Sequence, residues 1–161
     1  MAETKAEFDK KFGKDFSATA NANVLNLDQI NAAFDIAKLR FGGIDIVVNC
    51  AGLSISKPLA DTTVQDYDIL QDVLVKGQFL VSQSAVAIMR QQGLGGDIVN
   101  IASKNGLVSG PNNVAYGTAK AAQQHMSRLL AAELGGDKIR VNIVNPDAVI
   151  ADSNIWAGGW A

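Results

Sequence analysis

Hydrophobic positions along the chain follow two kinds of pattern. Four stretches have apolar residues spaced three or four apart and end near glycines, which predicts helices over residues 3–12, 28–39, 63–92 and 113–134. Three short runs are almost entirely apolar, which predicts strands buried on both faces: IDIVVN (44–49), DIVNIA (97–102) and IRVNIVNP (139–146). The segment TANANVL (19–25) predicts a further, weaker strand. Helix and strand therefore alternate four times.

This alternation predicts an α/β fold. Strands separated by helices long enough to cross over form a parallel sheet, with helices on both of its faces. In such sheets a ligand lies beyond the carboxyl ends of the strands. The segments at those ends are NCAG (49–52), ASKNG (102–106) and NPDAV (145–149), and we expect them to converge on one site. The chain has no internal repeat or linker, so residues 1–161 are expected to form a single domain.

Composition narrows the possible partners and locations. Hydrophobic residues make up 48% of the chain and charged residues 19%, as in globular proteins. A net charge of −2 argues against nucleic acid or an anionic membrane as partner. No apolar run reaches the roughly 20 residues of a membrane span. The charged N-terminus predicts no secretion signal, and the single Cys50 suits a reducing cytoplasm. We predict no metal site.

Tyr116 and Lys120 carry the strongest chemical signal. Residues four apart on a helix have Cβ atoms roughly 6 Å apart, so a lysine cation lies beside the tyrosine hydroxyl. Moving a tyrosine pKa from 10 to about 7 takes roughly 4 kcal/mol, and a neighbouring cation acts in this direction. Tyr116 is then a general acid/base. The alternative is a surface tyrosine, a solvated lysine and, at Ser103, a loop hydroxyl, but the joint spacing of the three favours catalysis.

Four motifs in register resemble the short-chain dehydrogenase/reductase family. NCAG resembles its N-N-A-G turn, Ser103 its catalytic serine, and Tyr116 with Lys120 its Y-x-x-x-K motif. Arg140-Val141-Asn142 followed by Asn145-Pro146 resembles its R-V-N-x-x-x-P-G segment. The resemblance implies a Rossmann-like doubly wound sheet, an NAD or NADP cofactor and hydride transfer to or from a small molecule. Ser103 then holds the substrate oxygen, and Lys120 binds the nicotinamide ribose.

The resemblance also implies contacts for further residues. Those expected along the cofactor are Asn26, Asn49, Ala51, Gly52, Tyr116, Lys120, Pro146 and Asp147. Those expected to touch substrate are Ser103, Lys104 and Asn105. Asp147 replaces the usual glycine, and either selects a substrate hydroxyl or is a solvated loop residue. Cys50 replaces the second asparagine of the turn and is expected to be small and buried.

Three longer phrases point to one branch of the family. ASKNGLVSG (102–110), VNPDAV (144–149) and IWAGGW (155–160) look like the dehydrogenase half of bifunctional rhamnulose-1-phosphate aldolase/short-chain dehydrogenase proteins. That likeness implies a role in rhamnose catabolism, on a small hydroxyaldehyde or sugar-derived alcohol such as lactaldehyde. Trp156 and Trp160 either belong to a substrate lid or simply pack.

The chain also departs from the family pattern. Leu74 stands where the family has an asparagine that holds a proton-relay water. The glycine-rich loop that cradles the cofactor pyrophosphate at a helix N-terminus has no counterpart, and G93-L94-G95-G96 is a turn. The resemblance therefore implies a fragment: a partial Rossmann-like sheet without the first strand, glycine-rich loop, first helix and second strand. Such a sheet is expected to expose an edge.

Two alternatives to an oxidoreductase remain at this point. One is an inactive truncated remnant that only associates, and the other is a sugar-nucleotide epimerase or dehydratase, since these also use Y-x-x-x-K. The family resemblance implies a homo-oligomer, a dimer or tetramer, formed through the helices at 63–92 and 113–134.

Overall fold

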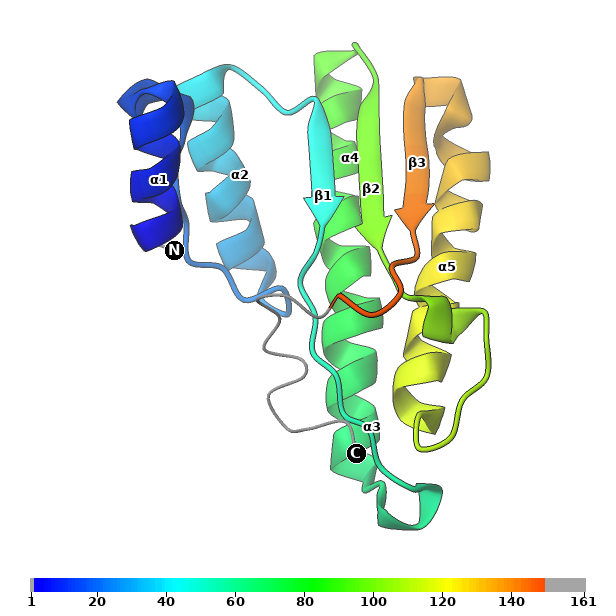
Figure 1. Ribbon diagram of the computed structural model, residues 1–161. Helices are drawn as coiled ribbons and strands as arrows, with labels where there is room; N and C mark the ends of the chain where they lie inside the picture. The colour runs from blue at the N-terminus through cyan, green and yellow to red at the C-terminus, as the bar shows by residue number, and fades with distance from the viewer. Residues whose placement is uncertain (1, 150–161) are drawn as a thin grey trace.

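The computed structural model describes residues 2–149 (Figure 1). Its α-helices are α1 (Ala2–Phe12), α2 (Leu27–Phe41), α3 (Val64–Leu70), α4 (Gly77–Gln92) and α5 (Val114–Leu134). Its strands are β1 (Ile46–Asn49), β2 (Gly96–Ile101) and β3 (Ile139–Val144). A π-helical segment, η3 (Gln71–Lys76), joins α3 to α4, and short 3₁₀ turns are η1 (Lys14–Phe16), η2 (Leu59–Asp61), η4 (Lys104–Gly106) and η5 (Gly135–Asp137). The phrase IWAGGW, with Trp156 and Trp160, lies outside the described residues.

The three strands form one parallel sheet in the order β1-β2-β3. Val47 pairs with Ile98, and Ile98 pairs in turn with Val141. Helical connections follow β1 and β2 and return the chain to the same end of the sheet, as parallel pairing requires. The predicted parallel α/β fold is confirmed. No helix of residues 2–149 is long and apolar enough to cross a membrane.

Helix ends follow the expected glycine and side-chain signals. Asn26 begins α2, where its side chain accepts a hydrogen bond from the Gln29 backbone N–H. Gly42 ends α2 and Gly93 ends α4, both in the left-handed conformation that glycine adopts without strain. The predicted turn at 93–96 therefore leads from α4 into β2.

The predicted strand at 19–25 is wrong. Among residues 2–149 this segment joins no sheet, and side chains bond its backbone instead. The Leu25 N–H donates to Asn23 Oδ1 (2.9 Å), and the Asn23 N–H donates to Gln29 Oε1 (2.8 Å). Asparagine side chains offer the backbone such local partners in place of a strand ladder.

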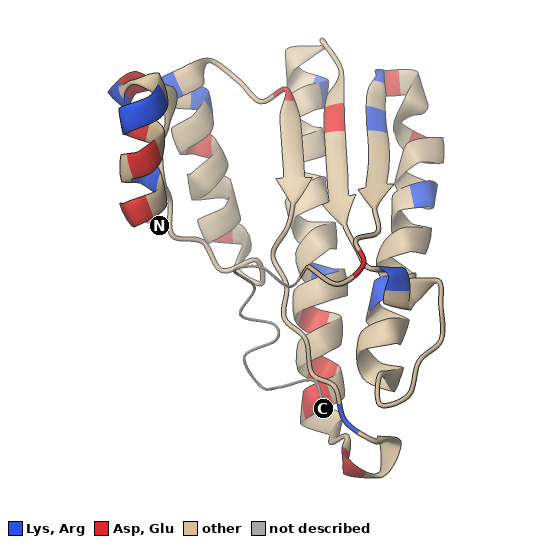
Figure 2. Cartoon of the chain, in the orientation of Figure 1, with Lys and Arg blue, Asp and Glu red and all other residues tan. Residues whose placement is uncertain are grey.

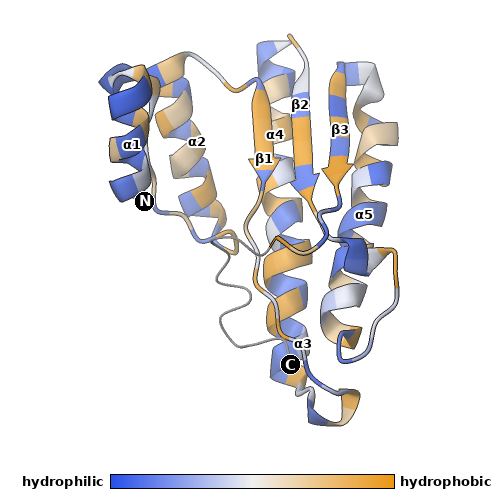
Figure 3. Ribbon diagram, in the orientation of Figure 1, coloured by the Kyte–Doolittle hydropathy of each residue, from blue (hydrophilic) through white to orange (hydrophobic). Residues whose placement is uncertain are grey.

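The prediction that strands are buried on both faces, with helices on each, is also wrong for the described residues. Val47, Ile98 and Val141 pack with Ala85 and Met89 of α4 in the main core. Strand residues alternate between faces, and on the opposite face Ile46 is 63% and Val48 57% exposed. Figure 1 shows α4 and α5 on one side of the sheet, and no helix of residues 2–149 covers the other. Figure 3 shows β1 in the colours of hydrophobic residues.

The predicted helix at 63–92 is confirmed, with a π-helical segment in its middle. Leu74 lies in this segment and is fully buried. A π-turn leaves carbonyl groups without their usual helical partners, and the Leu74 carbonyl accepts a 2.7 Å hydrogen bond from Gln123 Nε2 of α5. This bond joins the middle of the long helical stretch to the helix that carries Tyr116 and Lys120.

Candidate active site

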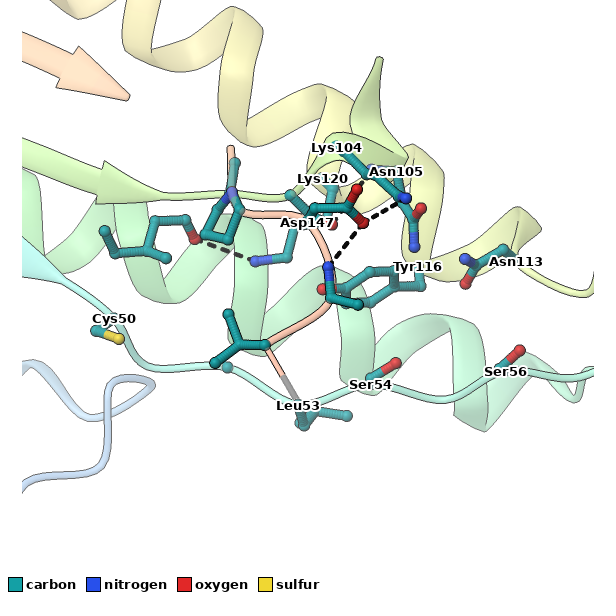
Figure 4. A pocket seen from close by; sticks show the side chains of 17 residues that line it. Cys50, Leu53, Ser54, Ser56, Lys104, Asn105, Asn113, Tyr116, Lys120 and Asp147 are labelled. Carbon is teal, nitrogen blue, oxygen red and sulfur yellow. Dashed lines mark hydrogen bonds and ion pairs between the residues drawn. The ribbon is translucent and has the colours of Figure 1, made fainter. Parts of the chain in front are cut away.

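A pocket of about 520 Å³ lies at the carboxyl ends of the three strands (Figure 4). Eight residues singled out from the sequence line it: Gly52, Ser103, Lys104, Asn105, Tyr116, Lys120, Pro146 and Asp147. The expected convergence of the segments that follow β1, β2 and β3 is confirmed. Figure 4 shows Tyr116 and Lys120 on the side of α5, with Leu53, Ser54 and Ser56 opposite them.

Tyr116 is buried on α5 and borders the pocket. Burial raises the pKa of its hydroxyl above the ordinary value, and a hydrogen bond with the Ser103 side chain partly offsets this rise. Lys120 Nζ lies over the face of the ring, 5.6 Å from its centre. The sequence predicted a lowered Tyr116 pKa, but in the protein alone the pKa is raised, because the desolvation of the buried hydroxyl is the larger effect.

Lys120 is only 5% exposed and lies one turn after Tyr116. Its Nζ donates a 3.1 Å hydrogen bond to the Ile101 carbonyl at the end of β2. Burial lowers the pKa of the Lys120 amine to about 8, against a smaller raising effect of Cys50. At neutral pH the pocket therefore holds a cation that titrates close to the physiological range.

Ser103 follows β2 in extended conformation and begins the short turn η4. Its Oγ accepts a hydrogen bond from the Asn105 N–H (3.2 Å). The next residue, Lys104, donates its backbone N–H to the Pro146 carbonyl at 3.1 Å, which ties this loop to the one after β3. The loops after β2 and β3 thus form one continuous wall of the pocket.

Lys104 and Asp147 form an ion pair across this wall (Figure 4). Asp147 also accepts a hydrogen bond from the Ala148 N–H (2.7 Å). The Lys104 ammonium, followed by the Ala148 bond, lowers the pKa of the Asp147 carboxyl. Both side chains are well exposed, so the pair offers a cation and an anion to a ligand in the pocket. Elsewhere, acidic and basic residues are interspersed, as on α1 in Figure 2.

Three predicted cofactor residues lie outside this pocket. The Asn26 side chain caps α2, and Ala51 is exposed. The Asn49 amide donates to Asn100 Oδ1 (2.8 Å) and Ser82 Oγ (3.2 Å), so it holds β1 to β2 and α4. Their contacts with a cofactor stay predictions.

The sequence reasoning missed several lining residues. Cys50, expected to be buried, is exposed and lines the pocket, because it directly follows β1 where the chain leaves the sheet. Ser54, Ser56 and Asn113 also line it. The Asn113 Oδ1 atom is buried and accepts no hydrogen bond from residues 2–149. Its place in the sequence could have indicated this position, because Asn113 stands at the start of the predicted helix that carries Tyr116.

The lining fits one half of a nicotinamide dinucleotide. The Lys120 amine and the Tyr116 hydroxyl are suitable partners for a ribose, and Gly52 and Pro146 supply backbone and apolar surface beside them. No glycine-rich phosphate loop occurs in the sequence. Residues 2–149 contain no group of three His, Cys, Asp or Glu side chains placed to hold a metal ion.

Known proteins match the chain across most of its length. The family model for Enoyl-(Acyl carrier protein) reductase matches residues 1–155. The uncharacterized oxidoreductase YuxG of Bacillus subtilis is 40% identical over 154 residues, which are 96% of this chain and 22% of YuxG. D-threitol dehydrogenase of Mycolicibacterium smegmatis is 36% identical over 130 residues, 81% of this chain and 50% of that protein.

Solved structures agree. A putative short-chain alcohol dehydrogenase from Sinorhizobium meliloti 1021 has a TM-score of 0.85 and 31% identity, over 97% of this chain and 62% of that one. A tyrosine-to-phenylalanine variant of ElxO with NADPH bound has a TM-score of 0.82 and 25% identity, over 91% of this chain and 60% of that one. The chain thus spans between about a fifth and three fifths of the length of these proteins. With the family model matched over nearly all of its residues, the chain belongs to the short-chain dehydrogenase/reductase family.

Proposed function

We propose that this chain carries the proton-transfer site of an NAD(P)-dependent oxidoreductase acting on a small hydroxyaldehyde or sugar-derived alcohol such as lactaldehyde. The observation that carries the proposal is the meeting of Ser103, Tyr116 and Lys120 in one pocket, from the loop after β2 and from α5. A nicotinamide cofactor, when bound, supplies or accepts the hydride. The chain's own residues bind the carbonyl oxygen and move the proton.

In the reducing direction, Tyr116 gives its hydroxyl proton to the carbonyl oxygen. The raised pKa keeps Tyr116 protonated and ready to act as the acid at neutral pH. The phenolate that results needs a cation nearby, and Lys120 is still mostly charged below its pKa of about 8. Ser103 holds the substrate oxygen within reach, since its hydroxyl already bonds Tyr116.

The polar lining supports a hydroxylated substrate. Lys104 and Asn105 offer donors. The Asp147 carboxylate and Asn113 Oδ1, which accepts no hydrogen bond from residues 2–149, offer acceptors. D-threitol dehydrogenase, a relative at 36% identity, is named for a polyol. Most of YuxG lies outside its match with this chain, which suits a bifunctional parent protein that has an aldolase half and a dehydrogenase half and serves rhamnose catabolism.

The cofactor contacts belong to the same proposal. Gly52, Lys120, Pro146 and Asp147 would hold the nicotinamide half in the pocket, and Asn49, Ala51 and Asn26 would follow the remainder. The NADPH in the ElxO structure supports a nicotinamide dinucleotide as the class of ligand. We further place the protein in the cytoplasm.

A homo-oligomer, a dimer or tetramer, is also part of the proposal. Apolar side chains stand exposed on the helices that would form it: Val64 (69%) and Ile69 (40%) on α3, Phe79 (47%) on α4 and Leu129 (57%) on α5. Size-exclusion chromatography with light scattering, which gives the molar mass of the wild type and of Phe79→Glu, tests the interface. A wild-type monomer would contradict it.

The function is tested by cofactor binding and turnover. The purified chain is titrated with NADH and NADPH up to millimolar concentration, and nucleotide oxidation is followed with lactaldehyde, with the four-carbon ketose that corresponds to threitol, and with a simple ketone. We expect binding of one nucleotide and a higher kcat/KM for the hydroxylated carbonyls. Absence of binding by both nucleotides would contradict the proposed function of this chain. Binding with turnover of the simple ketone alone would contradict the substrate class.

A further inference from the structure

Gln124 contacts the loop that carries Ser103. It lies on α5, one turn beyond Lys120, and is only 3% exposed. Its Nε2 donates a 3.1 Å hydrogen bond to the Ser103 backbone carbonyl. The same carbonyl accepts the Gly106 N–H at 3.1 Å, which closes the η4 turn. The Ser103 carbonyl is thus bonded both within its own turn and to the helix of Tyr116.

Gly106 brings the η4 turn directly against α5. A Cβ atom at Gly106 would lie 2.5 Å from Gln124 Nε2 and 2.7 Å from the Lys120 carbonyl carbon. Only a residue without a side chain permits this approach of two backbones. The turn therefore meets α5 beside Lys120, where Gly106 of the turn allows the close approach and Gln124 of the helix supplies the hydrogen bond.

This contact fixes the serine relative to its catalytic neighbours. The Ser103 Oγ accepts the Asn105 N–H within the same turn, so the orientation of the hydroxyl depends on where the turn lies. We infer that Gln124 is a positioning residue: its amide holds the Ser103 turn against α5, so that the Ser103 hydroxyl meets Tyr116 and the substrate oxygen. The expected effect on catalysis rests on the proposed function, whereas the statement that Gln124 holds the turn rests on the contacts alone.

Loss of the Gln124 amide leaves the Gly106 bond in place. The turn therefore persists but is no longer held to α5 by that amide. Displacement of a reacting group by about 1 Å costs on the order of 100-fold in rate. The effect should fall on kcat for the carbonyl substrate. KM for the nucleotide should stay unchanged, because neither Gln124 nor Ser103 is among the residues proposed to hold the nucleotide.

The test compares Gln124→Met with Gln123→Met. Gln123 is the adjacent residue, is 2% exposed and also gives its amide to a backbone carbonyl, that of Leu74, away from the Ser103 turn. Both variants thus lose one buried amide–carbonyl bond from α5. Hydrogen–deuterium exchange of the Asn105 and Gly106 amides is measured first, because it needs no turnover, and kcat and nucleotide KM follow.

We expect Gln124→Met to speed exchange of these two amides at least about tenfold and to lower kcat by about 10- to 100-fold. We expect Gln123→Met to change neither, and nucleotide KM to stay constant in both. Unchanged exchange in Gln124→Met, or equal losses in the two variants, would overturn the inference. Should Gln124→Met not fold, Gly106→Ala, which displaces the same turn, must show the same pair of effects. A wild-type chain without turnover would contradict the proposed function, while the exchange comparison would still decide whether Gln124 holds the turn.

Discussion

Lys120 lies over the ring of Tyr116, with its Nζ 5.6 Å from the ring centre, and gives a hydrogen bond to the Ile101 carbonyl. This arrangement anchors a buried cation between β2 and α5 beside the proposed acid. Burial acts on the two groups in opposite directions, raising the pKa of Tyr116 and lowering that of Lys120 to about 8. Desolvation favours the neutral form of both side chains, so near pH 7 the electrostatic cost of folding falls on Lys120, which is still charged.

Replacing Lys120 should therefore reveal a pH-dependent cost. In the unfolded chain its pKa is near 10.5, so between pH 8 and 10.5 the unfolded state binds more protons, and stability rises with pH. Below pH 8 the folded protein bears the full penalty of the charged amine. Lys120→Met should thus stabilise the chain more at pH 7 than at pH 10.5, by about 3 kcal/mol.

Urea unfolding of both proteins at the two pH values measures this difference. Lys120→Met also loses the hydrogen bond to Ile101, which lowers its free energy of unfolding equally at the two pH values. The informative quantity is therefore how the stability difference between variant and wild type changes with pH. A wild-type-to-variant difference that stays constant from pH 7 to 10.5 would show that Lys120 is not desolvated in the fold.

Asp147 provides a test of substrate selection. If its carboxylate accepts a substrate hydroxyl, Asp147→Asn should raise KM for lactaldehyde about tenfold, because a hydrogen bond to a charged acceptor is lost. The midpoint of unfolding should hardly change, since Asp147 and Lys104 are both exposed and such ion pairs contribute little.

The matched control is Asp137→Asn. Asp137 also forms an exposed ion pair, with Arg90, but does not line the pocket. The KM of Asp137→Asn for lactaldehyde should equal that of the wild type. Equal KM values in all three proteins would argue that Asp147 is a solvated loop residue.

Asn100 of β2 connects β1 to α5 through a buried polar network. It is fully buried, accepts the Asn49 amide and donates to Ser127 Oγ (2.9 Å). Asn100→Ala removes both of these buried hydrogen bonds and leaves Asn49 with Ser82 and Ser127 with the Gln123 carbonyl, which should lower the free energy of unfolding by about 2–4 kcal/mol. Asn142→Ala, on the exposed face of the neighbouring strand β3, should change it by less than about 0.5 kcal/mol. Similar losses in the two variants, measured by urea unfolding, would contradict the buried network.

The sequence predicted the parts of the structure that depend on local pattern. The helices and the meeting of the strand ends were readable because helical spacing, glycine stops and parallel order leave little choice. The segment at 19–25 was misread because the hydrogen bonds of Asn23 compete with a strand, and propensity does not show which wins. Cover on both faces was misread because the apolar residues Ile46 and Val48 say only that a face is apolar, not that anything lies over it.

The site shows the same division. Spacing placed Tyr116 beside Lys120, but the depth of burial, which decides the direction of the Tyr116 pKa, depends on residues far away in the chain. Gln124 gave no signal, since a glutamine in a helical pattern looks like a solvated residue. Only the fold shows it 3% exposed and bonded to a carbonyl twenty-one positions earlier.

The central claim is that Tyr116 transfers the proton in a nicotinamide-dependent reaction. The most direct measurement is the initial rate of NADH or NADPH oxidation with lactaldehyde, for the wild type, Tyr116→Phe and Tyr67→Phe. Tyr67 is the other tyrosine of the chain, stands partly exposed on α3 and does not line the pocket. We predict wild-type turnover, a loss of about 10²- to 10⁴-fold in Tyr116→Phe, and no loss in Tyr67→Phe. Turnover that survives in Tyr116→Phe at the wild-type rate would contradict the claim.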